Sequence, residues 1–223
     1  MNRGVVIVPT CVPNSLDDIA RAYTRYAWTD MLHLDIADGV FAPNTTWMPN
    51  TGDMLSSGNS CTLGAHLMVA KPRGLGVSLA LLGVRTLIGH VEVFGDADEA
   101  RRVFGTWKAA GATSLVLGVL MDTPIETLES YLGLCDFVHL MTIATVGRQG
   151  IPYDQTSLGR VAEVHAKYPE LIISVDGGIS EENIAELRRA GASHFAVGSF
   201  LAKAKSPEEA YKRLKELADS ASR

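Results

Sequence analysis

The chain has few of the features that mark membrane, secreted or disulfide-rich proteins. Its longest apolar stretches fall well short of the roughly 20 residues that a membrane-spanning helix needs, and the apolar run Val5–Pro9 is too short for a signal peptide. The three cysteines, Cys11, Cys61 and Cys135, lie far apart and include no Cys-x-x-Cys pair. This pattern predicts no disulfide framework. We therefore expect a cytoplasmic protein with no membrane partner, in which Cys61 and Cys135 act as small apolar residues. Cys11, which follows the end of the first expected strand, either does the same or lines the pocket.

Positive charge is also scarce. The chain has 20 Lys and Arg residues against 25 Asp and Glu residues, and its net charge is −5. Nucleic acid is therefore not an expected partner, because its phosphate backbone requires a broad cationic surface. A small phosphorylated ligand remains compatible with this charge, since backbone amides and helix N-termini hold a phosphate without many Lys or Arg side chains.

The sequence contains no tract rich in Ser, Gly or Pro, and no block of charge, that would separate two domains. At 223 residues and 47% hydrophobic content, the chain is long enough for one well-filled core. We expect a single βα-barrel domain over residues 1–223.

Short apolar runs rich in β-forming residues alternate with amphipathic segments along the whole chain. This alternation is typical of βα units and a parallel sheet. About eight repeats in a chain of this length favour an α/β fold of the eight-fold βα (TIM) barrel type, with an open doubly wound sheet as the alternative. The expected strands are Val5–Pro9, Met31–Asp35, Thr62–Leu67, Thr86–His90, Ser114–Leu120, Phe137–Met141, Ile172–Asp176 and His194–Val197.

Several segments carry helix signals. Ser15 precedes two acidic residues, as a helix N-cap does. Thr123-Pro124 and Ser206-Pro207 each place a proline just after a capping hydroxyl. The segment Glu181–Ala190 has acidic residues early and basic residues late, and it stops at Gly191.

Four polar residues, His33, Asp35, His66 and Asp176, lie at the ends of expected strands. In a parallel barrel those ends converge on one pocket. His33 and Asp35 also share one side of their strand, because alternate residues face the same way. Two imidazoles and two carboxylates suit a divalent zinc, iron, manganese or cobalt ion, without selecting among them.

The other histidines are weaker candidates. His90 either lines the pocket or pairs structurally with Glu92 or another polar group. His139 in mid-strand, His165 on a helix and His194 near the start of the last strand are assigned no chemistry.

Glycine follows the last two expected strands, in Gly177-Gly178 and in Gly198-Ser199. Glycine lets the backbone approach a ligand closely, and the loops after strands seven and eight of a barrel frequently bind phosphate. The two pairs therefore predict a phosphate site.

Taken together, several motifs resemble the ribulose-phosphate 3-epimerase family. They run in order through nearly the whole chain, and their combination is highly specific. They are His33-Leu-Asp-Ile-Ala-Asp-Gly-Val-Phe-Ala-Pro-Asn44, His66-Leu-Met-Val69, His90-Val-Glu92, Leu140-Met-Thr142, Val175-Asp-Gly-Gly-Ile179 and Val197-Gly-Ser199.

The resemblance implies a βα barrel that epimerises a ketose phosphate at the third carbon with one divalent metal ion. It implies that His33, Asp35, His66 and Asp176 bind the metal, and that Asp35 and Asp176 also transfer protons. It further places Met68 and Met141 beside the metal and a substrate-contacting hydroxyl at Thr10, and it makes a homo-oligomer plausible. The default substrate pair is D-ribulose 5-phosphate and D-xylulose 5-phosphate.

Two departures bear on the substrate. Ala37 stands where the family commonly has a methionine, and Ile143–Gly150 replaces its usual Pro-Gly-Phe-Gly-Gly-Gln loop. Gly147 and Gln149 are partial equivalents of that loop, and Arg148 is either a phosphate-binding cation or a solvated residue. Two alternatives follow, namely a 3-epimerase of another ketose phosphate such as a hexulose 6-phosphate, and a non-catalytic sugar-phosphate-binding or regulatory protein.

Overall fold

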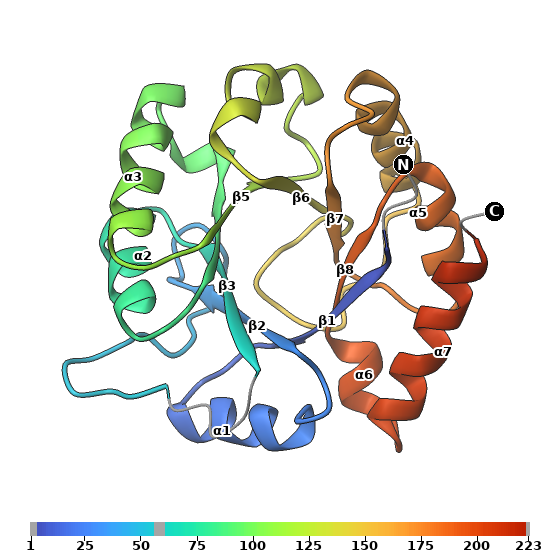
Figure 1. The fold of residues 1–223 in the computed structure, drawn as a ribbon, viewed down its shortest axis with the longest axis horizontal. Helices are drawn as coiled ribbons and strands as arrows, with labels where there is room; N and C mark the ends of the chain where they lie inside the picture. Colours follow the sequence, from blue (N-terminus) through green and yellow to red (C-terminus); the bar gives the residue numbers. More distant parts are fainter. Residues whose placement is uncertain (1–3, 56–60, 222–223) are drawn as a thin grey trace.

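Eight apolar segments form the parallel strands of a closed barrel in the computed structural model, which describes residues 4–55 and 61–221 (Figure 1). Each strand pairs with the next one in sequence, and the last pairs with the first, so the open-sheet alternative is wrong. The strands are β1 Val6–Cys11, β2 Met31–Ala37, β3 Thr62–Met68, β4 Thr86–His90, β5 Ser114–Val119, β6 Phe137–Met141, β7 Ile173–Asp176 and β8 His194–Val197.

The first three strands extend beyond their expected ends. β1 continues to Cys11, and β2 and β3 continue to Ala37 and Met68, which are partners in register. Hydrogen bonding to a neighbouring strand extends these strands, and a single segment of sequence does not reveal that pairing. Thr10 therefore belongs to a strand rather than to the loop that follows it.

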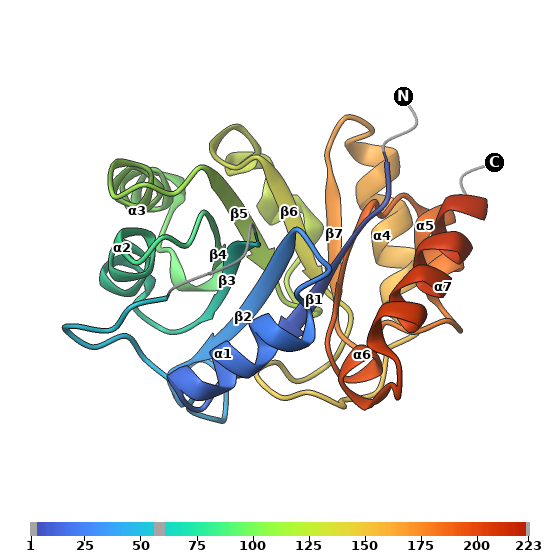
Figure 2. The ribbon, with the colours of Figure 1, turned by 60° about the horizontal axis from the view of Figure 1, so that its bottom comes forward.

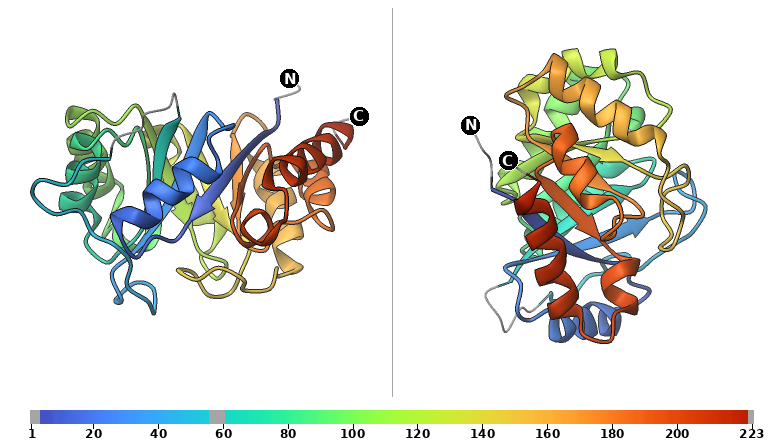
Figure 3. Two further views of the ribbon diagram at one scale, coloured as in Figure 1. Left: turned by 90° about the horizontal axis from the view of Figure 1, so that it is seen from below. Right: turned by 90° about the vertical axis from the view of Figure 1, so that its right-hand side faces the viewer.

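Helices surround the barrel on the outside, as Figures 2 and 3 show from other directions. The strands are nearly continuous runs of buried residues because helices cover their outer face while side chains fill the inside. The α-helices are α1 Leu16–Arg25, α2 Pro72–Leu81, α3 Ala97–Ala109, α4 Thr156–Lys167, α5 Ile184–Ala190, α6 Ser199–Lys203 and α7 Pro207–Ser220. The 3₁₀ helices are Val91–Val93, Ile125–Ser130 and Leu132–Leu134.

The predicted helix boundaries at Ser15 and Gly191 are confirmed. The Ser15 hydroxyl accepts a hydrogen bond from the Asp18 backbone N–H at 3.2 Å, and α1 begins directly after it. Gly191 ends α5 in the left-handed conformation, with φ of 119°. α5 itself begins at Ile184, later than the acidic residues Glu181 and Glu182 suggest.

The segment after Thr123-Pro124 is not the α-helix that the sequence indicates. Pro124 precedes a 3₁₀ helix, Ile125–Ser130. The Thr123 hydroxyl donates a hydrogen bond to Glu92 instead of accepting one from a helix amide, and the Thr123 carbonyl accepts from Arg160. These tertiary contacts hold Thr123 away from a capping role.

β2 connects to β3 through a long loop whose described part contains no helix. The Asp38 carboxylate organises its start, because it accepts hydrogen bonds from the backbone N–H groups of Val40, Phe41 and Ala70. The single domain expected over 1–223 also includes residues 1–3, 56–60 and 222–223, which lie outside the described residues. Within the described part, no helix is long and apolar enough to cross a membrane.

The cap of α1 leads to a stability prediction. Ser15→Ala should lower the free energy of unfolding by about 1 kcal/mol, because the Asp18 N–H loses its acceptor. Ser206→Ala is the matched control, since Ser206 is the N-cap of α7 but its side chain makes no capping hydrogen bond within the described residues. Urea denaturation compares the two variants with the parent protein. Equal destabilisation by both substitutions would contradict the prediction.

Candidate active site

The register of the strands brings side chains from five of them, most of them polar, to one end of the barrel. Asp35 on β2 lies beside His66 on β3, and Thr10 on β1 lies beside His33. On the other side, Met141 on β6 pairs in register with Asp176 on β7. These residues come from distant parts of the sequence and meet only because the barrel closes.

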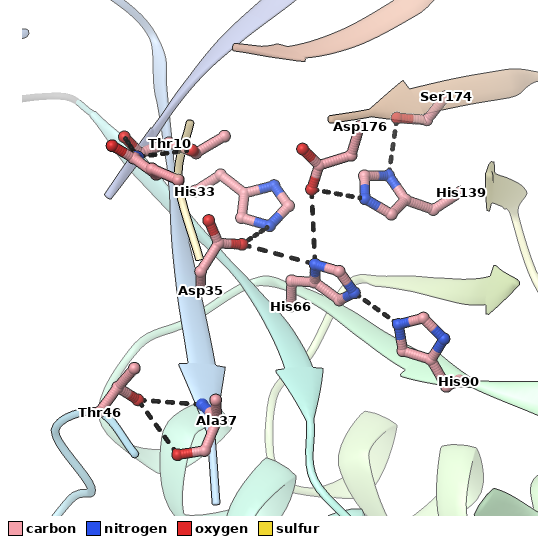
Figure 4. Close-up of polar contacts among 11 residues, drawn as sticks. Thr10, His33, Asp35, Ala37, Thr46, His66, His90, His139, Ser174 and Asp176 are labelled. Atoms are coloured by element: carbon pink, nitrogen blue, oxygen red, sulfur yellow. Dashed lines mark hydrogen bonds and ion pairs between the residues drawn. The ribbon is translucent and has the colours of Figure 1, made fainter. Parts of the chain in front are cut away.

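Their side chains form a buried cluster of imidazoles and carboxylates (Figure 4). Asp35 Oδ1 lies 3.2 Å from His33 Nε2 and 3.4 Å from His66 Nδ1. Asp176 Oδ2 lies 3.5 Å from His66 Nδ1 and 3.2 Å from His139 Nε2. His66 therefore stands between the two carboxylates, and each carboxylate has a second imidazole beside it.

The donor atoms fit a divalent metal. Metal bonds of about 2.0–2.2 Å place neighbouring ligand atoms roughly 2.8–3.6 Å apart in tetrahedral or octahedral geometry, and all four separations above fall in that range. His33 Nε2, Asp35 Oδ1 and His66 Nδ1 are also buried without a hydrogen-bond partner among the described residues. Buried polar atoms of this kind are rare unless something satisfies them, and a cation at their centre would do so.

His139 belongs to this cluster, although the sequence analysis assigned it no chemistry. One ligand atom from each of His33, His66, His139 and Asp176 lies within 4.8 Å of the others. His139 Nδ1 is also 2.9 Å from Ser174 Oγ, and the two residues pair in register between β6 and β7. The available signal was its position two residues before Met141, which puts both side chains on the same face of β6.

The electrostatics of the cluster favour ionised carboxylates. Burial by itself would raise the pKa of the Asp35 carboxyl, but His33 and then His66 lower it below its ordinary value. For Asp176 the effect of burial is likewise outweighed, by hydrogen bonding to His139 and His66, so its pKa is also lowered.

The imidazoles are affected in different directions. Burial lowers the pKa of His139 to about 4, which keeps it neutral. Burial also acts to lower the pKa of His66, but the neighbouring carboxylates of Asp176 and Asp35 outweigh it and raise the pKa to about 9. Without a metal, His66 therefore carries the proton that balances the two carboxylates.

His90 pairs with Glu92, which was one of the two alternatives expected for it, and it also contacts His66. Its Nδ1 lies 3.0 Å from Glu92 Oε2, and its Nε2 lies 2.6 Å from His66 Nε2. Burial lowers the pKa of His90. Burial alone would raise the pKa of the Glu92 carboxyl, but hydrogen bonds from His90, Thr123 and the Leu120 backbone outweigh it and lower this pKa. His90 is wholly buried behind His66 and is not among the residues that line the cavity.

A cavity opens above the cluster, and nearly all of the expected site residues line it. His33 is the exception, because it lies beneath the cavity wall. The carboxylates of Asp35 and Asp176 keep 10% and 14% of their side-chain surface exposed, so both are accessible from the cavity. The expected residues that line the cavity are Thr10, Asp35, His66, Met68, Met141, Gly147, Arg148, Asp176, Gly177, Gly178, Gly198 and Ser199.

The glycine-rich side of the cavity requires glycine for steric reasons. Gly178 has a φ of 65°, and a Cβ there would lie 2.6 Å from the Tyr153 backbone nitrogen. A Cβ at Gly198 would lie 2.6 Å from Thr10 Oγ1. The segments that follow β7 and β8 therefore need glycine for packing, and they line the cavity at the position where phosphate was expected.

The loop Ile143–Gly150 lines the same cavity and is anchored at several points. The Gln149 side-chain amide donates to the Thr10 carbonyl and lies 3.3 Å from the Thr10 hydroxyl. Gly147 packs against Asn44 with a φ of 89°. Arg148 is exposed at the cavity rim.

The opposite wall of the cavity is apolar. Met68 and Met141 pack with Ala37 and Ile143 in a small cluster that is separate from the main core. Ala37 is fully buried in this cluster and is not among the residues that line the cavity.

The three cysteines are free, and none lines the cavity. Burial, followed by the nearby charge of Asp35, raises the pKa of Cys11 to about 12. A thiol with this pKa is not an activated nucleophile. Cys11 therefore takes no part in the candidate site.

Comparisons with known proteins agree with this geometry. The model of the ribulose-phosphate 3 epimerase family matches residues 12–202. The ribulose-phosphate 3-epimerase of Aquifex aeolicus is 32% identical over 196 residues, which is 86% of each chain. The cytoplasmic isoform of this enzyme from Oryza sativa is 29% identical over 213 residues, covering 94% of this chain and 92% of that protein.

Solved structures of more distant proteins share the fold alone. The 3-hexulose-6-phosphate synthase of Salmonella typhimurium aligns with a TM-score of 0.67 at 13% identity, over 97% of this chain and 99% of its own. KGPDC from Streptococcus mutans aligns with a TM-score of 0.69 at 11% identity, over 98% of this chain and 99% of its own.

The proton on His66 predicts a pH dependence of stability in the metal-free protein. Its pKa rises from 6.5 in the unfolded chain to about 9 in the folded one, so its stabilising contribution is complete below about pH 6.5 and is lost as the pH rises through 9. The loss is at most about 3.5 kcal/mol, since one pKa unit corresponds to about 1.4 kcal/mol. Urea denaturation of chelator-treated protein at pH 6.5 and 9 measures it. The same slope in His66→Gln would refute this assignment.

Proposed function

Because this chain belongs to the ribulose-phosphate 3-epimerase family, we propose that it epimerises a ketose phosphate at the third carbon, with D-ribulose 5-phosphate and D-xylulose 5-phosphate as the substrate pair. One observation carries the proposal. The carboxylates of Asp35 and Asp176 reach a single cavity from two separate strands, and each is held ionised by its own imidazole neighbours.

The chemistry explains why two carboxylates are needed. Inverting a carbon beside a carbonyl removes a proton from one face of the carbon and returns a proton to the other face, through a planar enediolate. Asp35 on β2 and Asp176 on β7 are separated around the barrel by β1 and β8. Substrate lying between them would therefore present opposite faces to the two carboxylates, one of which accepts a proton while the other donates one.

We assign His33, Asp35, His66 and Asp176 as the ligands of one divalent metal ion, with His139 next to them. The unpartnered atoms and the spacing of the donors support this assignment. A bound metal would supply stabilisation of the negative charge that develops on substrate oxygen. The donor set is compatible with zinc, iron, manganese or cobalt.

The remaining cavity residues suit the rest of a sugar phosphate. The backbone at Gly177, Gly178, Gly198 and Ser199 would receive the phosphate, as the loops after strands seven and eight do in many barrels. The Thr10 hydroxyl, oriented by Gln149, would contact the sugar. Met68 and Met141 would exclude water from the reacting carbon.

Solvent-deuterium exchange tests this proposal. Proton NMR should show metal-dependent deuterium incorporation at the third carbon of ribulose 5-phosphate, in a panel that includes xylulose 5-phosphate and a hexulose 6-phosphate. Asp35→Asn and Asp176→Asn should each abolish interconversion of the epimers, because each removes the proton carrier for one face. Substantial epimerisation by either variant, with metal occupancy verified, would contradict its role.

The panel also separates the alternatives. Faster exchange with the hexulose 6-phosphate would show that the longer sugar is the preferred substrate. The two departures from the family pattern, Ala37 and the loop Ile143–Gly150, would then be the first places to look for the cause of this preference. Binding of sugar phosphate without exchange at any panel member would favour a non-catalytic binding protein.

Arg148 at the cavity rim predicts a split in the kinetic parameters. Arg148→Ala should raise KM about tenfold and change kcat less, because a charge-assisted hydrogen bond to phosphate is lost while the proton carriers stay in place. Steady-state kinetics measures both parameters. Arg189→Ala on the exposed side of α5 is the control and should change neither. An unchanged KM in Arg148→Ala would show that Arg148 is a solvated residue.

A further inference from the structure

A line of three side chains leads from the metal-binding side of His66 into the protein. Its members are His66 on β3, His90 at the end of β4, and Glu92 in the 3₁₀ helix that follows. The two imidazoles meet through their Nε2 atoms at 2.6 Å, and His90 Nδ1 lies 3.0 Å from Glu92 Oε2. Figure 4 shows His90 on the side of His66 that faces away from Asp35 and Asp176.

Glu92 is held in place at the far end of this line. Its other oxygen, Oε1, accepts hydrogen bonds from the Leu120 backbone N–H at 2.8 Å and from the Thr123 hydroxyl. An ionised carboxylate only accepts hydrogen bonds. The nitrogen that faces Oε2, Nδ1 of His90, must therefore carry a proton.

The proton on His90 Nδ1 determines which nitrogens of His90 and His66 carry the other protons, because each hydrogen bond in the line needs one donor and one acceptor. Full burial favours the neutral form of His90, which has one N–H and one unprotonated nitrogen. With its proton on Nδ1, His90 presents an unprotonated Nε2 to His66. His66 must then carry a proton on its own Nε2, and in its neutral form Nδ1 has a free lone pair. That Nδ1 is the atom between the two carboxylates.

We propose that Glu92, acting through His90, is a positioning residue that fixes the tautomer of His66 so that Nδ1 is the metal-binding nitrogen. This role rests on the metal site of the proposed function and adds to it two residues outside the ligand set. Partners of this kind behind a metal-binding histidine fix its ring orientation and proton location.

The surrounding packing supports the role. A Cβ at Gly118 on β5 would lie 3.1 Å from Cδ2 and Nε2 of His90. The absence of a side chain at this position leaves room for the His90 ring beside His66. The ring centroids of His66 and His90 lie 4.9 Å apart with their planes inclined by 23°, so the two rings meet edge to edge at their Nε2 atoms, as a hydrogen bond between these nitrogens requires.

Glu92→Gln tests the proposal because it preserves shape but changes the proton pattern. The glutamine oxygen has to face the Leu120 N–H, so its NH₂ group faces His90 Nδ1 and donates to it. His90 then donates from Nε2, and His66 is left with its proton on Nδ1. We expect zinc affinity, measured by competition with a chromophoric chelator, to fall about 10–100-fold.

Nitrogen-15 NMR of the zinc-loaded protein provides the second readout. In the parent protein His66 should be protonated on Nε2, and His90 on Nδ1 with an unprotonated Nε2. In Glu92→Gln the proton of His90 should move to Nε2. This measurement on the parent protein needs no variant, so it decides the question even if Glu92→Gln does not fold. Glu216→Gln on the exposed face of α7 is the matched control and should change neither readout.

The outcomes distinguish this role from the proposed function. Unchanged zinc affinity and an unchanged proton pattern in Glu92→Gln would overturn the role of Glu92 alone, as would a parent protein with His66 protonated on Nδ1 while zinc is bound elsewhere in the cluster. A parent protein that takes up no zinc, iron, manganese or cobalt would overturn the metal site and this role together.

Discussion

The burial of Asp35 and Asp176 beside three imidazoles is the interaction on which the rest of the site depends. An ionised carboxylate in a protein interior is costly unless a partner compensates its charge. Here the proton on His66, which stands between both carboxylates, compensates part of this charge, while His33 and His139 lie beside Asp35 and Asp176. Three buried nitrogen and oxygen atoms of this cluster have no hydrogen-bond partner in the described structure, and a cation bound between them would satisfy all three.

The barrel provides the rigidity that this arrangement requires. Every member of the cluster is on a strand, and the neighbouring strands hold its register on both sides. Loops form the cavity around the cluster, with residues 147–150 and the glycines after β7 and β8 among the lining residues. In the proposed function, proton transfer would depend on the strands, whereas recognition of the sugar phosphate would depend on the loops.

Much of the fold could be predicted because its signals are local. The strand at Thr86–His90, the cap at Ser15 and the left-handed Gly191 each follow from a few adjacent residues. Thr123-Pro124 has the same kind of local signal, and a helix does begin there, but it is a 3₁₀ helix and the predicted capping by Thr123 was wrong. Its hydroxyl is bound by Glu92, which lies 31 residues earlier in the chain, and a contact of this kind overrides the local preference.

The sequence by itself determined the alternation of strands and helices, and it placed two pairs of acidic and imidazole groups at strand ends. Only the tertiary structure decided that His139 joins them and that His90 links His66 to Glu92. The reason is that strand pairing sets the distance between side chains that lie 24 to 37 residues apart. Hydrogen bonds at that range depend on the closed barrel and its register, which no individual segment of the chain encodes.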